Sequence, residues 1–347
     1  MSQIEATRTR IKAIRRPRIG FLGVGWIGRH RMNAIIEAGD VEAAAIADPA
    51  DQMRSDAGQL APAAQTVASF EELLACDLDG VVIATPSALH AEQSIRALQR
   101  GLAVFCQKPL GRTRREVEDV VDAARKADRL LAVDLSYRFT DGMRKIKQLI
   151  EEGQLGTIFA ADLVFHNAYG PDKDWFYDKA RSGGGCVTDL GVHLADLALW
   201  CIDFPQVNKV ESKIFSGGRP LAAGSKTVED YAVATLHLKS GAVVRLTCSW
   251  RLQAGRDAII EARFHGTEGG AELRNVDGSF YDFTAAYHQG NHSETLSLPP
   301  DAWGGRAAQD WAKRLAAGSH YDPQCERLIE VAALIDDIYA ASEHAAG

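Results

Sequence analysis

The stretch RIGFLGVGWIG at residues 18–28 decides the fold class. Its first five residues form an apolar run typical of a buried strand, and glycines follow at the spacing G-x-G-x-x-G. At this spacing Gly23 permits a tight turn, Gly25 lets the backbone approach a pyrophosphate, and Gly28 lets the next helix pack closely on the strand. The free N–H groups of that helix would face the anion, so the stretch predicts a dinucleotide-binding unit. The residues predicted to lie against the cofactor here are Gly23, Gly25, Trp26, Ile27 and Gly28.

Outward from this stretch, short apolar runs alternate with helical segments through the first 137 residues. Two segments, 69–72 and 113–116, begin with Ser or Thr and carry Glu three residues later, which is the capping box that starts a helix. Such alternation is typical of a parallel sheet with helices on both faces. We therefore predict a doubly wound Rossmann domain over residues 17–137, in the α/β class. Its predicted strands are residues 18–22, 41–47, 81–85, 103–106 and 130–135.

The pattern changes after about residue 138, where strand-like runs follow one another without helices between them. Lys239-Ser240-Gly241, between two of these runs, is a hairpin signal. Successive strands predict a mostly antiparallel sheet, so residues 138–347 are expected to form a second, α+β domain. Residues 277–300 are too mixed in character to assign. The predicted strands are residues 158–166, 207–215, 231–238, 242–250 and 259–265, and the predicted helices are residues 142–152, 306–317 and 324–341.

The composition is that of an ordinary globular protein of about two domains. The chain has 347 residues, 46% hydrophobic and 24% charged, which excludes disorder, collagen-like repeats and a coiled coil. With 39 Lys and Arg against 46 Asp and Glu the net charge is −7, so neither nucleic acid nor a membrane is an expected partner. Six cysteines lack metal-ligand spacing, so no metal site is expected. Without an apolar run of transmembrane length or a signal-like N-terminus, we expect a cytoplasmic protein.

The first 18 residues carry six basic side chains and a single acidic one, Glu5. We expect residues 1–16 to form a basic arm that is solvated or docks on a partner, since termini are often poorly ordered. The segment does not have the composition of a targeting peptide.

Asp48 lies at the end of the second predicted strand, 20 residues after Gly28. A carboxylate at this place accepts both hydroxyls of an adenosine ribose and repels a 2′-phosphate, which favours NAD over NADP. Arg54 lies six residues further along and leaves NADP open. The alternative is structural: the glycines only relieve local crowding, and Asp48 only caps a loop.

Two further strand ends are predicted to line the cofactor groove, because ligands of open α/β sheets lie beyond the carboxyl ends of the strands. One is the segment 84–87, with His90 a turn into the next helix, where a helix-surface role is the alternative. The other is the segment 106–109, Cys-Gln-Lys-Pro, whose proline keeps the preceding lysine extended and aimed into the cleft. The groove residues predicted at this rim are Thr85, Pro86, His90, Gln107 and Lys108.

The segment 182–196, SGGGCVTDLGVHLAD, holds the main catalytic candidates. Three glycines in a row can bring the backbone close to a ligand, and the residues after them predict a helix that continues to Trp200. On that helix Asp189, His193 and Asp196 would share one face. A carboxylate beside an imidazole orients it and raises its pKa above about 6.5, which suits a base that takes a proton from an alcohol. There are three alternatives. Asp189 could be only the helix N-cap, Asp189 and His193 could form only a surface contact, or the two could bind a metal ion.

The loop at residues 169–181 combines aromatic and polar side chains, as polyol recognition requires. We predict that Trp175 and Tyr177 bind substrate, and Asp172, Lys173 and Arg181 are further candidates. A structural loop packed over the cleft is the alternative.

These motifs, together with Tyr137-Arg138-Phe139, resemble the glucose-fructose oxidoreductase, inositol dehydrogenase and rhizopine catabolism (Gfo/Idh/MocA) family over residues 17–340. The resemblance implies an N-terminal Rossmann domain and a C-terminal open-faced sheet whose outer face forms a homodimer or homotetramer. It also implies Lys108, Asp189 and His193 as the catalytic set, with His193 as the acid/base and Lys108 holding the reacting oxygen. The residues expected to bind substrate are Tyr137, Arg138, Trp175, Tyr177, Asp189 and His193.

One residue departs from the family pattern, which usually reads Glu-Lys-Pro where this chain has Gln107-Lys108-Pro109. An amide keeps hydrogen bonds but carries no charge, so we expect Lys108 to have less electrostatic support.

The predicted function is hydride transfer between NAD, or NADP, and a secondary alcohol or hemiacetal carbon of a sugar, sugar acid or cyclitol. Two alternatives remain open. One is an NAD-dependent glycosidase that oxidises a sugar transiently, and the other is a non-catalytic NAD-binding regulator, which Gln107 and the basic arm suggest.

Overall fold

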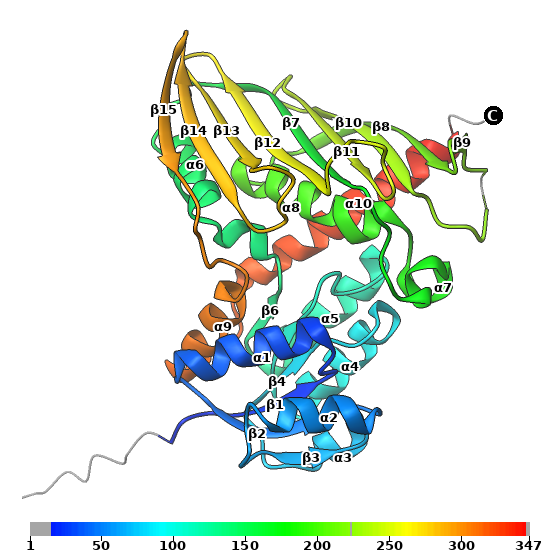
Figure 1. Ribbon diagram of the computed structural model, residues 1–347, viewed down its shortest axis with the longest axis vertical. Helices are drawn as coiled ribbons and strands as arrows, with labels where there is room; N and C mark the ends of the chain where they lie inside the picture. The colour runs from blue at the N-terminus through cyan, green and yellow to red at the C-terminus, as the bar shows by residue number, and fades with distance from the viewer. Residues whose placement is uncertain (1–14, 223, 345–347) are drawn as a thin grey trace, which may run out of the picture.

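The computed structural model describes residues 15–222 and 224–344, which form a C-terminal sheet at the top of Figure 1 and an N-terminal sheet at the bottom. Most of the predicted basic arm, residues 1–14, lies outside the described residues. Arg15, at its described end, pairs with Asp79 at 3.1 Å, close to the start of the first strand.

The N-terminal sheet confirms the predicted Rossmann fold. Its six strands, all within the described residues, are parallel and lie in the order β3-β2-β1-β4-β5-β6. The central strands are buried along almost their whole length because helices cover both faces. Strand β3 was not predicted, since its three residues include two exposed side chains and carry no apolar run. The strands are β1 (Arg18–Leu22), β2 (Glu42–Ala47), β3 (Gln65–Val67), β4 (Gly80–Ile83), β5 (Ala103–Cys106) and β6 (Leu131–Val133).

The helices of this half begin where the sequence signals place them. The Ser69 hydroxyl accepts the Glu72 N–H, and the Glu72 carboxylate accepts the Ser69 N–H, so this capping box is complete. At Thr113 only the hydroxyl half forms, because the Glu116 carboxylate binds Arg112 instead. The helices are α1 (Trp26–Ala38), α2 (Asp51–Gly58), α3 (Phe70–Leu74), α4 (Ser87–Gln99) and α5 (Arg114–Ala127).

The C-terminal sheet has nine strands within the described residues, in the order β15-β14-β13-β12-β7-β11-β10-β8-β9. Adjacent strands in this sheet are antiparallel, except that β7 and β11 pair in parallel. This confirms the prediction of a mostly antiparallel sheet. The hairpin predicted at residues 239–241 joins β10 to β11. Strands β13 to β15 extend the sheet through the segment that could not be assigned. The strands are β7 (Ile158–Asn167), β8 (Val207–Ser216), β9 (Arg219–Pro220), β10 (Tyr231–Leu238), β11 (Val243–Ser249), β12 (Ala258–Gly266), β13 (Gly270–Asn275), β14 (Phe283–Gln289) and β15 (His292–Ser297).

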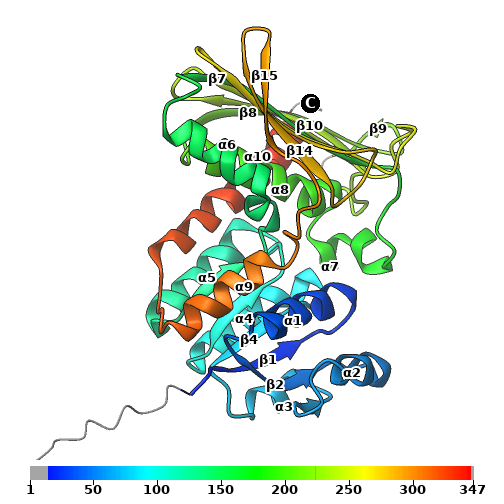
Figure 2. The same ribbon diagram turned by 60° about the vertical axis from the view of Figure 1, so that its left-hand side comes forward.

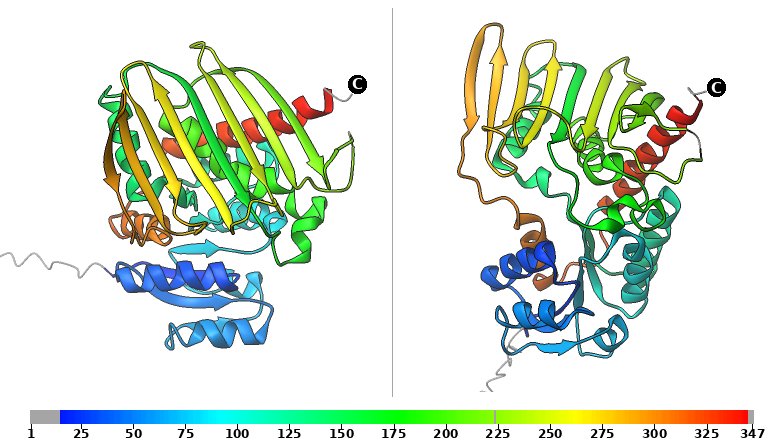
Figure 3. Two further views of the ribbon diagram at one scale, coloured as in Figure 1. Left: turned by 45° about the horizontal axis from the view of Figure 1, so that its top comes forward. Right: turned by 45° about the vertical axis from the view of Figure 1, so that its right-hand side comes forward.

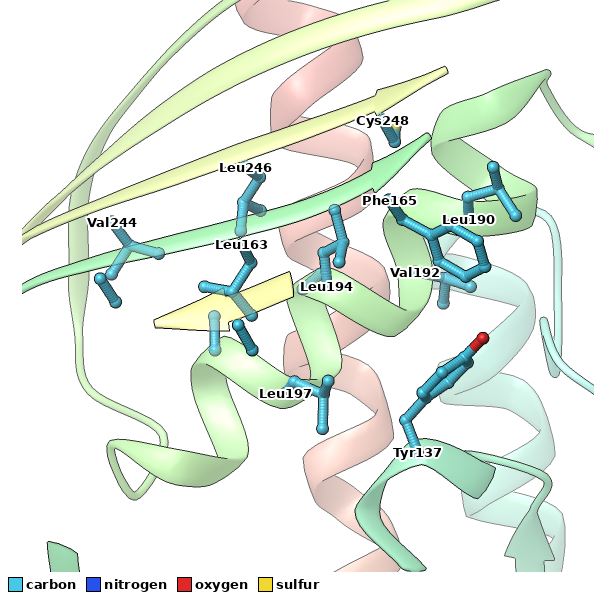
Figure 4. Packing of buried hydrophobic residues seen from close by; sticks show 14 of the residues in the cluster. Tyr137, Leu163, Phe165, Leu190, Val192, Leu194, Leu197, Val244, Leu246 and Cys248 are labelled. Carbon is cyan, nitrogen blue, oxygen red and sulfur yellow. The ribbon is translucent and has the colours of Figure 1, made fainter. Parts of the chain in front are cut away.

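Three helices, α6, α8 and α10, cover one face of this sheet, and no described helix lies on the other (Figures 2 and 3). In the core between them Leu163 and Leu246 of the sheet face Leu194 and Leu197 of α8 (Figure 4). None of the described helices combines the length and apolar character needed to cross a bilayer. The remaining elements are η1 (Ser136–Phe139), α6 (Asp141–Glu151), η2 (Asp174–Tyr177), α7 (Lys179–Ser182), η3 (Val187–Gly191), α8 (Val192–Cys201), α9 (Arg306–Ala316), η4 (Pro323–Glu326) and α10 (Arg327–His344).

Helix α9 returns to the N-terminal half, although the sequence analysis places residues 306–317 in the second domain. Its Trp311 is fully buried and lies 5.9 Å, between ring centroids, from Phe105 of β5. The same cluster contains Ile19 and Phe21 of β1, so α9 completes the core under one face of the Rossmann sheet.

Candidate functional site

The glycine loop has the geometry expected of a dinucleotide site. Gly23 has a φ of +79°, which favours glycine, and a Cβ at Gly28 would overlap the Gly23 carbonyl oxygen. A Cβ at Gly25 would meet nothing within 4 Å, so the backbone is open at the point where a pyrophosphate would approach. Helix α1 starts there without a side-chain cap, so its N-terminus is free to face an anion. Trp26 is 64% exposed beside this opening, and Ile27 is half-buried.

Asp48 and Arg54 are both held by local contacts. The Asp48 carboxylate accepts the N–H groups of Val24 and Ala50, each at 2.9 Å, which ties the end of β2 to the glycine loop. The Arg54 guanidinium binds the Asp48 carbonyl oxygen and the Asp51 carboxylate. Asp48 therefore lies against the glycine loop, and Arg54 is engaged with α2 and the end of β2.

The rim after β4 is braced by a buried histidine. The ring nitrogens of His90 lie 2.7 Å from the carbonyl oxygens of Thr85 and Pro109, and the side chain is 1% exposed. The Thr85 hydroxyl donates to Gln93 at 2.6 Å. His90, considered either as a groove residue or as a surface residue, is in fact a buried link between the strand ends that carry Pro86 and Lys108.

Lys108, Asp189 and Trp250 form the centre of the site. The Lys108 ammonium donates to Asp189 Oδ1 and to the Asp189 carbonyl oxygen, both at 2.6 Å. The Trp250 indole N–H donates to Asp189 Oδ2 at 3.0 Å, so both carboxylate oxygens are occupied. Lys108 comes from the Rossmann half and Trp250 follows β11, so this contact joins the two halves of the chain. Gln107 turns away from Lys108 and donates to Asp134.

His193 does not have the partner that the sequence analysis expects. The segment Val187–Gly191 is a single π-helical turn, a feature often found at functional sites, and it changes the assumed α-helical register between Asp189 and His193. Among residues 15–222 and 224–344, no group hydrogen-bonds to the His193 ring, and Asp189 faces Lys108 and Trp250. Burial lowers the pKa of His193 well below 6.5, and the positive charges of Lys108 and Arg31 lower it further. The expected rise in pKa is therefore replaced by a fall, and His193 is neutral at neutral pH.

Asp196 and Arg138 pair with each other instead of facing the site. The Arg138 guanidinium binds both Asp196 oxygens, with the Nε contact at 2.8 Å, and lies over the rings of Trp200 and Phe204. Burial raises the pKa of Asp196, although Arg138 opposes that rise. The pair holds η1 against α8, and the Arg138 Nε and Nη2 groups are engaged there.

Tyr137, next to Arg138, does reach the site. Its ring packs edge-on against the His193 ring at 4.8 Å and lies 4.9 Å from Trp303, and Figure 4 shows its hydroxyl pointing toward Val192 and Phe165. Burial raises the pKa of Tyr137, so the phenol stays protonated. The buried face of His193 is thus an aromatic wall, which favours the neutral imidazole.

The triple glycine packs against protein groups and is not a ligand-binding backbone. A Cβ at Gly184 would overlap the Tyr339 hydroxyl, and one at Gly185 would overlap the Glu229 carbonyl oxygen. Glu229, which the sequence analysis missed, accepts the N–H groups of Gly185 and Val187 at 2.9 Å and the Tyr339 hydroxyl at 2.8 Å. Its carbonyl oxygen accepts the Cys186 N–H. The only signal in the sequence is an acid directly before an apolar strand.

The aromatic loop is connected to the same centre. Trp175 stacks on Phe176 at 3.8 Å, and Tyr177 meets Trp250 edge-on at 5.6 Å. The Tyr177 hydroxyl donates to the Pro171 carbonyl oxygen and accepts from Arg251. Asp172 and Lys173 pair with each other at the surface, and Arg181 is exposed. Tyr177 of this loop therefore contacts Trp250, which in turn donates a hydrogen bond to Asp189.

The described residues contain no group of three or more His, Cys, Asp or Glu side chains that could hold a metal ion.

Two family models match the chain. One, described as an oxidoreductase family with an NAD-binding Rossmann fold, matches residues 17–135, and the other, the GFO/IDH/MocA C-terminal domain, matches residues 143–272. Rhizopine catabolism protein MocA of Rhizobium meliloti is 30% identical over 258 residues, which cover 74% of this chain and 78% of that protein. The chain belongs to the Gfo/Idh/MocA family.

A second relative and a solved structure extend the comparison. D-glucoside 3-dehydrogenase of Escherichia coli (strain K12) is 28% identical over 236 residues, and the match spans 65% of each chain, slightly less than two thirds of that enzyme. The solved structure of levoglucosan dehydrogenase in complex with NADH superposes with a TM-score of 0.82 at 23% identity, over 94% of this chain and 97% of that one. This likeness supports the same two-part fold.

Proposed function

We propose that this protein is an NAD(P)-dependent dehydrogenase that oxidises a secondary alcohol or hemiacetal carbon of a sugar, sugar acid or cyclitol, or reduces the corresponding carbonyl. The observation that carries the proposal is the placement of a buried, neutral His193 close to the Lys108–Asp189 ion pair, at the rim of a sheet with an open glycine loop. These groups can move a proton and stabilise an alkoxide, which is what alcohol oxidation needs from a protein. The nicotinamide supplies the hydride acceptor.

In the oxidative direction, His193 takes the hydroxyl proton on a ring nitrogen while the C–H bond of the same carbon gives up its hydride. The Lys108 ammonium lies where it can stabilise the negative charge that develops on the substrate oxygen. Asp189 holds Lys108 in place by two hydrogen bonds, and Trp250 fixes the other oxygen of Asp189. In this scheme Asp189 acts through Lys108 and not by steadying the imidazolium.

For the cofactor, NAD is preferred to NADP. The two Asp48 oxygens each hold one backbone N–H and keep lone pairs for ribose hydroxyls, while a 2′-phosphate would meet a negative charge. Arg54 is already bound to Asp51 and would have to leave it to reach a phosphate.

For the substrate, an uncharged sugar fits the aromatic surroundings of the site. Trp175 and Tyr177 offer aromatic rings, which suit the C–H faces of a polyol ring. The names of the relatives, D-glucoside 3-dehydrogenase and levoglucosan dehydrogenase, support a pyranose as the first class to test.

The test follows nicotinamide absorbance with NAD⁺ and, separately, NADP⁺ over a panel of aldoses, aldonates, cyclitols and glycosides. We expect one substrate group to reduce NAD⁺, and His193→Ala to lower turnover by about 10² or more with little change in nucleotide affinity. Equal turnover in that variant would contradict the assigned role of His193. Release of free sugar from glycosides without net cofactor reduction would identify a glycosidase, and tight nucleotide binding without turnover would identify a regulator.

We also propose that copies of the chain assemble through the outer face of the C-terminal sheet, as a dimer or tetramer. That face carries no described helix, while α6, α8 and α10 cover the other (Figure 3). Light scattering of the purified protein should give a mass of two or four chains, and a monomer would contradict the proposal.

A further inference from the structure

A buried ion pair lies directly behind the turn that carries Lys108. Asp134 follows β6 and is 1% exposed, and its Oδ2 accepts two hydrogen bonds of 2.6 Å, one from Arg31 Nε and one from Gln107 Nε2. The Arg31 side chain is 8% exposed and comes from α1, which begins at the glycine loop. Three elements around the cofactor groove thus meet at one carboxylate oxygen.

The amide at position 107 and the carboxylate at position 134 depend on each other. Gln107 can donate to Asp134 because it carries an NH₂ group, whereas a glutamate there would bring a second buried carboxylate within hydrogen-bonding distance of the first. In this chain the carboxylate behind the lysine turn is that of Asp134.

The charge of Asp134 matters for His193 because of Arg31. The positive charges of Lys108 and Arg31 both act on the His193 ring and disfavour its protonated form. Asp189 pairs with Lys108, and Asp134 pairs with Arg31, so each cation near His193 has one carboxylate of its own. The other titratable groups near this cluster are His30 on α1, Cys106 on β5, and Tyr137 and Tyr281 beside the His193 pocket.

We propose that Asp134 is a positioning residue of the active site, which holds Gln107 and Arg31 and thereby sets the net charge that His193 experiences. The proposal rests on the proposed function in one respect: it takes His193 as the group that exchanges the substrate proton. It assigns to Asp134 a role that spacing and motif do not indicate, since the residue lies outside every motif of the sequence.

The test exchanges the two groups. Asp134→Asn removes a negative charge, Gln107→Glu adds one, and the double variant restores the original charge with the amide and the carboxylate in exchanged positions. In the wild type, kcat/KM for oxidation should fall at acidic pH as His193 becomes protonated. Asp134→Asn should move this fall to lower pH and Gln107→Glu to higher pH, each by roughly half a pH unit to one unit. The double variant should return to within about 0.3 unit of the wild type.

Two further measurements make the result independent of turnover. The first is NMR titration of the His193 ring in the complete chain, assigned by its loss in His193→Ala, which should show the same opposite shifts. The second is the dissociation constant for NADH, measured by fluorescence. It should rise in both single variants and return to the wild-type value in the double variant. Asp122→Asn is the matched control, because it removes a carboxylate paired with Arg125 on the exposed surface of α5.

Shifts of the two single variants in the same direction, or a double variant no better than the worse single variant, would overturn the proposal. If Asp134→Asn does not fold, Arg31→Gln/Asp134→Asn replaces the ion pair by two amides and should titrate like the wild type. If instead His193→Ala keeps full turnover, the proposed function fails, while the NMR shifts still decide the role of Asp134.

Discussion

Lys108 and Asp189 form an ion pair of 2.6 Å across 81 positions of sequence, between the rim of the Rossmann sheet and the π-helical turn before α8. The contact is polar, partly buried and shared with Trp250, so it fixes the ammonium at the junction of the two halves. A partly buried pair of this kind responds strongly to loss of one partner because the other keeps its charge.

Asp189→Asn should lower turnover by about 10² while leaving the fold intact, because the amide keeps the shape but no longer holds the Lys108 ammonium by charge. Steady-state kinetics with the substrate found in the panel would measure this, and NADH affinity would be measured in parallel. Asp122→Asn, at the exposed pair with Arg125 on α5, is the control and should match the wild type. A loss of less than about threefold would show that Lys108 is placed by other contacts.

Trp250→Phe tests the second contact of Asp189. It keeps most of the ring packing but removes the indole N–H, so kcat/KM should fall about tenfold to a hundredfold, which is the loss of one hydrogen bond to a charged group. The matched control is Trp311→Phe, whose indole nitrogen has no hydrogen-bond partner among the described residues. If both variants lose activity equally, the Trp250–Asp189 bond has no special role.

The pH dependence follows from the lowered pKa of His193. The neutral ring is the form that accepts a proton, and a pKa below 6.5 means that this form persists into mildly acidic solution. Oxidation should therefore stay constant from neutral pH down to below about pH 6.5 and fall only at more acidic pH. The folded protein also binds this proton less readily than the unfolded chain, so His193 lowers stability as the pH falls below about 6.5. If the rate of oxidation, followed from alkaline toward acidic pH, already begins to fall above pH 7, this assignment is contradicted.

Glu229→Leu should destabilise the protein by about 1–3 kcal/mol and lower turnover together, because it removes the oxygen that accepts two N–H groups of the turn that carries Asp189. Thermal unfolding and kinetics would measure the two effects. Tyr339→Phe removes one of the Glu229 contacts and should cost less in both measurements. The prediction fails if turnover is unchanged while stability falls, since Glu229 would then be structural only.

Trp311→Ala should lower the free energy of unfolding by about 3–5 kcal/mol, since it leaves a cavity under the Rossmann sheet. Denaturant titration would measure this. Trp26→Ala is the comparison, because Trp26 is exposed and its loss should change stability by less than about 0.5 kcal/mol.

Most of the fold follows from local patterns. The five predicted strands of the first half lie within a few residues of β1, β2, β4, β5 and β6, because buried parallel strands are continuous apolar runs. Residues 277–300 could not be assigned for the opposite reason. Strand β15, at the edge of its sheet, has mostly exposed polar residues, and it forms a strand because it pairs with β14.

The candidate site shows where a single sequence stops being informative. Spacing on an assumed α-helix predicted that Asp189, His193 and Asp196 share a face, but a π-helical turn, a lysine and an arginine determine where the two carboxylates point. The partners of Asp189 and Asp196, which are Lys108 and Arg138, lie 81 and 58 residues away. Such contacts depend on tertiary packing, and no periodicity records them.

Helix α9 gives the chain a particular order of events during synthesis. The Rossmann sheet emerges from the ribosome first, yet the face that Trp311 covers stays without its cover until the last tenth of the chain has begun to appear. Until α9 has been made, the apolar surface that Trp311 covers is exposed in the growing chain. The half that holds the glycine loop therefore obtains the last part of its core from residues that follow the whole C-terminal sheet in the sequence.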